Sequence, residues 1–206
     1  MTDLITRFYD GRLSDELFTL PNGINEFDIA VIDGTYYLAY DDQTTTQLVS
    51  APTLQGLADA TPAAPRPAGR YPSILHDSGQ WHLWVWEGAC SNHYVATDFA
   101  GPYEFSDALP LALTDIHVRR LSNGLCYAVY KDQTVTNRRV GTLVSPSLSG
   151  PWTNMGHAFD DSDRPLFQGE AADPALFEAD GETYLVFSGW DGSTPTCPPS
   201  APMAQI

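Results

Sequence analysis

The chain has 206 residues and a formal net charge of −16, with 10 Lys plus Arg against 26 Asp plus Glu. This acidity argues against a nucleic-acid partner or an anionic membrane partner, because either would need a basic patch that so few cations can hardly supply. The length favours a single domain over residues 1–206, and 12% aromatic residues with 16 glycines and 16 prolines favour many short strands joined by tight turns.

One pattern, a short apolar strand followed by a glycine turn and an aromatic strand, occurs four times. Its turn glycines recur at intervals of about 45 to 57 residues, a period typical of radially arranged repeats. The turn glycines are Gly34, Gly79, Gly124 and Gly181. We therefore predict an all-β protein, a β-propeller built from four recognisable repeats of about 45 residues, with four blades or an incomplete ring.

The first unit is preceded by residues 1–26, which hold one strand pattern at residues 4–9. Unit one then runs from Phe27 to residue 69, and its Asp33-Gly34 pair between apolar runs predicts a β-hairpin. A closed ring would need an extra strand beside unit four. We expect residues 4–9 to supply it and so to close the ring, because closure removes exposed sheet edges.

The later units contain the most aromatic part of the chain. In unit two, Trp84 and Trp86 share one face of a strand and Trp81 lies on the other, so we expect one set to pack between blades. After unit four, residues 190–206 form a Pro-rich tail. The later units occupy residues 71–110, 113–160 and 170–189.

The cysteines and the N-terminal sequence point to no special chemistry. Cys90, Cys126 and Cys197 are odd in number and lack metal-ligand spacing, so we expect neither a disulfide framework nor a metal site, and no cofactor. The first residues lack a basic start followed by an apolar run, and no stretch approaches the ~18 apolar residues of a membrane span. We expect a soluble chain without a signal peptide or transmembrane segment.

Carboxylates recur at one position of the repeat. When the first strands are aligned by apolar residues, the position three residues earlier is acidic in three of the four units. The alignment uses Val31, Ile74, Val118 and Leu176 and gives Asp28, Tyr71, Asp115 and Asp173. First strands of propeller blades line the central channel, and carboxylates that converge there repel one another unless they bind something or share protons. Each Asp alone is also a common turn residue that accepts backbone hydrogen bonds.

These motifs resemble the five-bladed propellers of glycoside hydrolase family 43 and its relatives, families 32 and 62, and the likeness covers roughly residues 27–189. Three features carry it: Asp-Pro at the start of a strand, a glycine turn followed by Tyr-Leu, and a strand closing in Gly-Pro-Trp. They stand at Asp173-Pro174, at Gly34 to Leu38 and Gly181 to Leu185, and at Gly150-Pro151-Trp152.

The resemblance implies a base Asp on blade one, a second Asp that orients substrate, and an acid Glu on a later blade. Asp28 matches the base and Asp115 the second Asp. The family's acid motif is Glu-Gly-Pro, whereas here Glu170 stands two residues too early and Asp173 takes the position at the strand start. The acid is therefore Glu170 or Asp173. Such chemistry needs one protonated and one ionised carboxyl group.

Three further residues are candidate substrate contacts. Tyr71 replaces the carboxylate in unit two, and His117 lies two residues beyond Asp115 on the same strand face, where it either reaches a sugar or ion or is a structural histidine. Trp190 either stacks on a sugar ring or caps the core.

Two functions remain open. The first is a glycosidase that acts on a polysaccharide or oligosaccharide through the channel carboxylates. The second is a non-catalytic propeller that binds glycan or assembles into a larger structure, for example a virion. Both predict a carbohydrate partner or self-assembly. The separations between the carboxylates distinguish them, because hydrolysis requires defined spacings.

Overall fold

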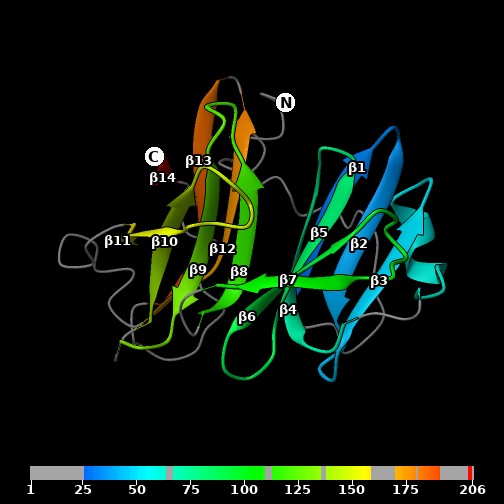
Figure 1. The fold of residues 1–206 in the computed structure, drawn as a ribbon, viewed down its shortest axis with the longest axis horizontal. Coiled ribbons are helices and arrows are strands. Elements are labelled where there is room, and N and C mark those ends of the chain that lie inside the picture. Colours follow the sequence, from blue (N-terminus) through cyan, green and yellow to red (C-terminus); the bar gives the residue numbers. More distant parts are fainter. Residues whose placement is uncertain are drawn as a thin grey trace.

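The computed structural model describes residues 26–63, 67–109, 113–135, 138–158, 170–179 and 181–190, and the strand at residues 204–205. In this part of the chain four antiparallel sheets follow one another from the blue and cyan β1–β3 to the orange β12 and β13 (Figure 1). The all-β propeller class predicted from the repeat is confirmed. Among the described residues, no helix is long and apolar enough to span a bilayer.

Each of the first three sheets is formed by one sequence unit, whereas sheet four also contains a strand from the tail at residues 190–206. In all four sheets the strands follow chain order. Sheet one contains β1 (Phe27–Ile32), β2 (Thr35–Asp41) and β3 (Thr46–Ala51), followed by the 3₁₀ helix η1 (Gln55–Asp59). Sheet two contains β4 (Arg70–Asp77), β5 (Gln80–Trp86), β6 (Ser91–Ala96) and β7 (Glu104–Ala108). Sheet three contains β8 (Leu113–Arg120), β9 (Cys126–Asp132), β10 (Arg139–Ser145) and β11 (Thr153–His157). Sheet four contains β12 (Glu170–Ala179), β13 (Glu182–Trp190) and β14 (Ala204–Gln205).

Two-residue turns join the first two strands of sheets one and two. Asp33 and Gly34 have φ of 50° and 78°, and Ser78 and Gly79 have φ of 51° and 79°. Positive φ at both central residues is the geometry whose twist matches that of the flanking strands, and glycine adopts it without strain. The hairpin predicted at Asp33-Gly34 is therefore confirmed.

The core lies between neighbouring sheets. Trp81 is buried against Ala39 and Leu48 of sheet one, whereas Trp84 is buried against sheet three, in a cluster that includes Leu113 and Val118. Trp81 and Trp84 thus lie on opposite faces of β5, as the strand pattern predicted. Both faces pack against a neighbouring sheet, whereas we expected this of one set only. The first strands β1, β4, β8 and β12 contact one another in sequence, so they are the innermost strands.

The closure of the ring lies partly outside the described residues. The third strand of sheet four is β14, which pairs with β13 through Tyr184 opposite Gln205 and Leu185 opposite Ala204. Two residues of the Pro-rich tail therefore form a strand. The predicted strand at residues 4–9 lies outside the described residues, and its role in closure stays a prediction.

Candidate functional site

A bulge at the start of three innermost strands positions the site. In β4, β8 and β12 one extra residue is inserted at the shift in pairing register, so two residues of the strand lie opposite one residue of its partner. The first of these two residues has a positive φ in each strand: 54° at Tyr71, 50° at Asp115 and 52° at Asp173. A non-glycine residue in this region is strained, and bulges near sites commonly redirect a side chain.

Sheet one follows the same pattern without the inserted register shift, and this corrects the alignment made from sequence. Ile29 pairs with Leu38 in the way that Ile74 pairs with Leu83. The residue equivalent to Tyr71, three positions before Ile74, is therefore Glu26. The sequence alignment used Val31 instead of Ile29 and was wrong by two residues, so it placed Asp28 where Glu26 belongs.

The sequence contained a signal for the correct alignment. Ile29, Ile74 and Leu176 each lie five residues before their turn glycine, whereas Val31 lies three residues before its own. Counting back from the turn rather than matching apolar residues would have found Glu26.

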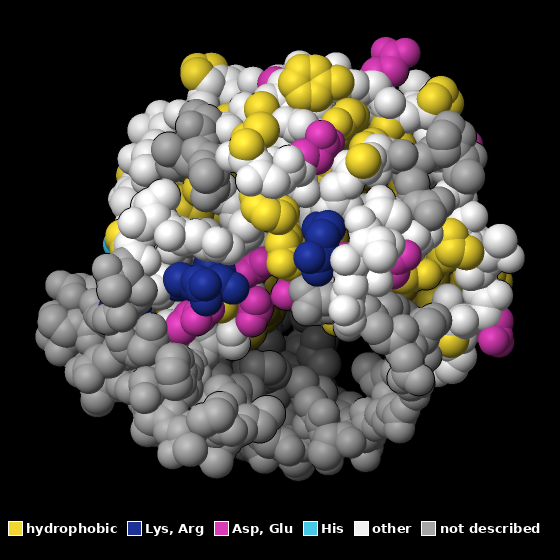
Figure 2. All heavy atoms as spheres, turned by 90° about the horizontal axis from the view of Figure 1, so that it is seen from below, with side chains coloured by type: hydrophobic (Ala, Val, Ile, Leu, Met, Phe, Trp, Pro, Cys, Tyr) yellow, Lys and Arg dark blue, Asp and Glu magenta, His cyan; other side chains and the backbone are white. Residues whose placement is uncertain are grey.

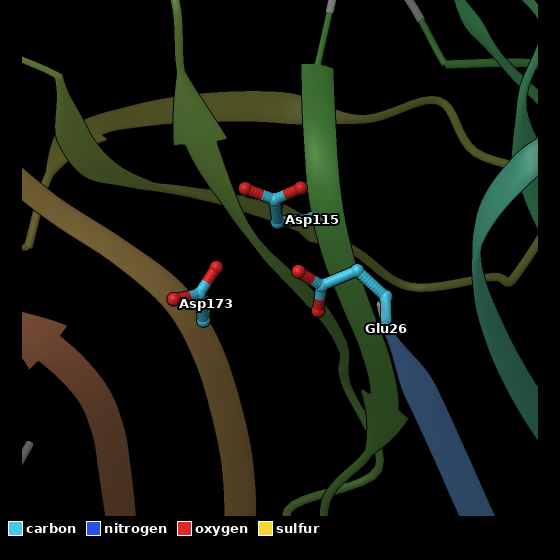
Figure 3. Close-up of side chains that lie close together, drawn as sticks. All are labelled: Glu26, Asp115 and Asp173. Atoms are coloured by element: carbon cyan, nitrogen blue, oxygen red, sulfur yellow. The ribbon is translucent and has the colours of Figure 1, made fainter. Parts of the chain in front are cut away.

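Three carboxylates converge from three different sheets (Figure 3). Glu26 immediately precedes β1, Asp115 lies on β8 and Asp173 on β12, and their side chains point toward one another. One carboxylate oxygen from each lies within 4.8 Å of the others. The structure thus brings together Asp115 and Asp173, as predicted, and adds Glu26.

The crowding changes the protonation of the cluster. Burial, together with the nearby charges of Asp173 and Asp115, raises the pKa of Glu26 to about 8. Burial also raises the pKa of Asp115, although the Lys131 ammonium opposes this shift. Glu26 is therefore protonated at neutral pH, so one member of the cluster can donate a proton.

Lys131 on β9 provides the positive charge at this site, and sequence reasoning missed it. Its Nζ lies 2.8 Å from Oδ2 of Asp115 and 3.4 Å from Oε1 of Glu170. Arg138 NH1 lies 3.1 Å from the other oxygen of Glu170. The structure therefore places Glu170, a candidate acid, between two cations beside the cluster rather than within it.

Asp28, the candidate base, occupies a buried ion pair. Arg119 NH2 donates to Asp28 Oδ1 at 2.7 Å, and Arg119 NH1 donates to Oδ2 at 3.2 Å. Ser73 Oγ and the Ile74 amide also donate to Oδ2, at 3.0 and 2.9 Å. Burial opposes ionisation of Asp28, but Arg119 and His117 outweigh burial and hold its pKa well below its usual range.

The same position of each repeat links one sheet to the next. Asp28 accepts from the Ile74 amide, Ser73 Oγ accepts from the Val118 amide at 3.0 Å, and His117 Nδ1 accepts from the Leu176 amide at 3.0 Å. Burial and Arg119 lower the pKa of His117. His117 is thus a neutral link between sheets three and four, and its Nε2 lies 3.5 Å from Asp28 Oδ1.

A small cavity lies next to the carboxylates. Its volume is about 90 Å³, and its lining includes Glu26, Phe27, Tyr71, Asp115, His117 and Asp173. On the face seen in Figure 2, acidic side chains gather between two basic groups at the rim of a hollow. The cavity is lined by both charged and aromatic residues, a combination suited to a polar ligand with an apolar face.

The two aromatic candidates differ in what the structure describes. Tyr71 lines the cavity, and its ring lies 5.7 Å from Trp86, with the Arg70 guanidinium 5.0 Å from its centroid. Trp190 pairs with Glu170 across β12 and β13, and its side chain lies outside the described part of the chain. A sugar-stacking role for Trp190 therefore stays a prediction.

The donor set also bears on metal binding. Three carboxylate oxygens within 4.8 Å could hold a hard divalent cation such as Ca²⁺ or Mg²⁺, which prefer oxygen ligands. Lys131 already supplies one positive charge next to Asp115.

Comparison with solved structures identifies the fold. A xylan β-1,4-xylosidase from Bacillus halodurans superposes with a TM-score of 0.64 at 21% identity, over 85% of this chain and 39% of that one. A thermostable family 43 glycoside hydrolase superposes with a TM-score of 0.62 at 12% identity, over 91% of this chain and 75% of that one. An α-L-arabinofuranosidase from Clostridium thermocellum superposes with a TM-score of 0.61 at 13% identity, over 84% of this chain and 63% of that one. This chain has the fold of the family 43 glycoside hydrolase propellers.

The likeness is structural and partial. No protein-family model matches the sequence, and no curated protein matches it. The family 43-like chain spans 39% of the xylosidase and 63% of the arabinofuranosidase. At identities of 12 to 21% the likeness shows the fold alone, and any chemistry depends on the residues of the site.

Proposed function

We propose that this family 43-like propeller hydrolyses a glycosidic bond at the cluster of Glu26, Asp115 and Asp173. The observation that supports it best is the raised pKa of Glu26, about 8, caused by burial and by the charges of Asp173 and Asp115. Glycoside hydrolysis needs one carboxyl group that is protonated at neutral pH beside another in a different environment. The cluster offers such a pair in Glu26 and Asp173.

Glu26 is the proton donor in this proposal. Its backbone is held in place because the Asp41 amide donates to the Glu26 carbonyl at 2.7 Å. The protonated side chain donates to the leaving glycosidic oxygen as the bond from the sugar breaks. Asp115 raises the pKa of Glu26, and Lys131 keeps Asp115 in position at 2.8 Å.

Asp173 is the base. It is exposed, so water reaches it, and Ser188 Oγ donates to its Oδ2 at 2.6 Å, which fixes the orientation of the carboxylate. The second oxygen can accept a proton from a water that attacks the sugar carbon. Each turnover consumes one water, and exchange with solvent returns the proton from Asp173 to Glu26.

The substrate class follows from charge and from the structural neighbours. A chain with a net charge of −16 and an acidic site favours a neutral sugar over a uronic acid. The neighbours include a xylan β-xylosidase and an α-L-arabinanase in complex with arabinohexaose. Xylosyl and arabinosyl glycosides are therefore the first substrates to test.

One observation favours the second function, glycan binding without hydrolysis. The three carboxylate oxygens lie within 4.8 Å of one another, whereas inverting enzymes separate their two carboxyl groups by about 6.5–9.5 Å to leave room for a water. Without a change on binding, the cluster would hold a glycan hydroxyl rather than activate water.

The test measures hydrolysis and binding together. Wild type, Glu26→Gln and Asp173→Asn are assayed on aryl β-xyloside, aryl α-arabinofuranoside and the corresponding oligosaccharides, with Glu104→Gln on β7 as a matched control. We expect turnover in wild type and Glu104→Gln, and a loss of about 10²-fold or more in kcat for the two site variants with binding retained. Wild-type binding without turnover would establish the second function instead, and the absence of both would refute carbohydrate recognition.

A further inference from the structure

An aromatic residue next to the proton donor is exposed where its equivalents are buried. Phe27 follows Glu26, as Pro72 follows Tyr71 and Pro174 follows Asp173. Pro72 and Pro174 are buried, and Ile116, which follows Asp115, is also buried. Phe27 is 55% exposed. The repeat therefore uses this position for packing in three sheets, and packing does not account for the aromatic side chain in sheet one.

Phe27 lines the same cavity as the carboxylates, and Tyr71 lines it from the neighbouring sheet. The Tyr71 side chain is redirected by a backbone φ of 54°, and the Trp86 ring and the Arg70 guanidinium lie beside its ring. The site thus has one aromatic ring held by neighbours and one exposed ring, both beside charged groups. Aromatic faces of this kind suit a ligand with one apolar side and a polar rim.

The size of the cavity places the ligand over Phe27. Its volume of about 90 Å³ is smaller than the cavity of ~150 Å³ that holds a single benzene ring. The cavity can therefore admit only part of one sugar ring. The rest of that ring has to lie at the mouth, where Phe27 is exposed.

We infer that Phe27 is a specificity-determining residue that stacks on the apolar C–H face of a neutral sugar ring whose hydroxyl edge faces Glu26 and Asp173. The inference rests on the proposed recognition of glycan at this cluster. A uronic acid bound in the same orientation would bring its carboxylate toward Asp173. Phe27 therefore holds the ring where the acidic cluster selects neutral sugars against acidic ones.

The experiment measures binding in the Glu26→Gln background, which prevents hydrolysis during titration. The probes are xylotriose, arabinohexaose and a glucuronic acid oligomer. The variants are Phe27→Ala, Phe27→Tyr as the rescue, and Phe105→Ala on β7, which removes a ring that is 60% exposed outside the cavity. Melting temperatures are recorded for each variant.

We expect Phe27→Ala to weaken binding of the neutral probe about three- to tenfold, and Phe27→Tyr and Phe105→Ala to leave it unchanged. The melting temperatures should stay the same, because Phe27 is exposed. In active protein Phe27→Ala should raise KM more than it lowers kcat. Unchanged affinity for the neutral probe in Phe27→Ala would overturn the inference and leave the proposed function standing. Tighter binding of the acidic oligomer than of the neutral probes would overturn the inference in the same way. A wild type that binds no probe overturns both.

Discussion

Replacement of Asp28 by asparagine separates a structural role from a catalytic one. The Asp28 carboxylate accepts two hydrogen bonds from Arg119, and both side chains are largely buried, with 5% and 21% exposed. Asparagine keeps the shape but removes the charge, and its NH₂ group faces the donors that surround the site. Arg119 would then be left as a buried cation without its counter-charge.

The expected cost is large. Removing one partner of a buried ion pair costs about 3–5 kcal/mol of unfolding free energy. For a chain of this size, that corresponds to a fall in Tm of about 6–20 °C. The matched control is Asp77→Asn, because Asp77 pairs with the adjacent Arg120 at 3.0 Å in a more exposed place, where an ion pair is worth about 0–1 kcal/mol.

The assay is thermal and urea denaturation of wild type, Asp28→Asn and Asp77→Asn at pH 7 and at about pH 2, which lies below the usual pKa of an aspartate. The folded-state pKa of Asp28 is held far below its usual value by Arg119, so the stabilisation is complete above the unfolded pKa of about 3.9 and is lost as the pH falls further. Asp28→Asn should therefore lack this part of the acid sensitivity. Unchanged stability combined with abolished hydrolysis would refute the reasoning and favour Asp28 as the catalytic base.

Three other predictions concern the site and the core. Lys131→Met removes a positive charge that lowers the pKa of Glu26, so the alkaline limb of the pH–rate profile should move above its expected wild-type position near pH 8. An alkaline limb that does not move would contradict the assignment of Glu26 as the proton donor. Glu26→Gln should raise Tm more at pH 8 than at pH 5. The folded-state pKa of Glu26 is raised, so its contribution to stability falls as the pH rises from about 4.5 to about 8. Equal changes in Tm at the two pH values would count against a buried, protonated Glu26. Gly141→Ala should cost about 1–3 kcal/mol in urea denaturation, since the added Cβ would clash with the buried Tyr130 ring, and a neutral effect would show that the ring can move.

The local signals in the sequence were sufficient for the architecture. The Asp33-Gly34 turn and the alternation around Trp81 and Trp84 depend on neighbouring residues only, so they predict hairpins and buried faces without any knowledge of the rest of the chain. The period of the repeat then predicts that equivalent strand starts converge. This reasoning brought Asp115 and Asp173 together correctly.

The tertiary structure decided which residues complete the site. One extra residue bulges out of β4, β8 and β12 at the shift in pairing register, where Tyr71, Asp115 and Asp173 lie. In sheet one the strand pairing shows that Glu26 is their equivalent, whereas the match of apolar residues had selected Asp28. The charge of Lys131 reaches Asp115 from the adjacent strand, and Arg119 reaches Asp28 from a different sheet. Protonation of a carboxyl group depends on burial and on charges brought close in space, and the sequence alone contains neither quantity.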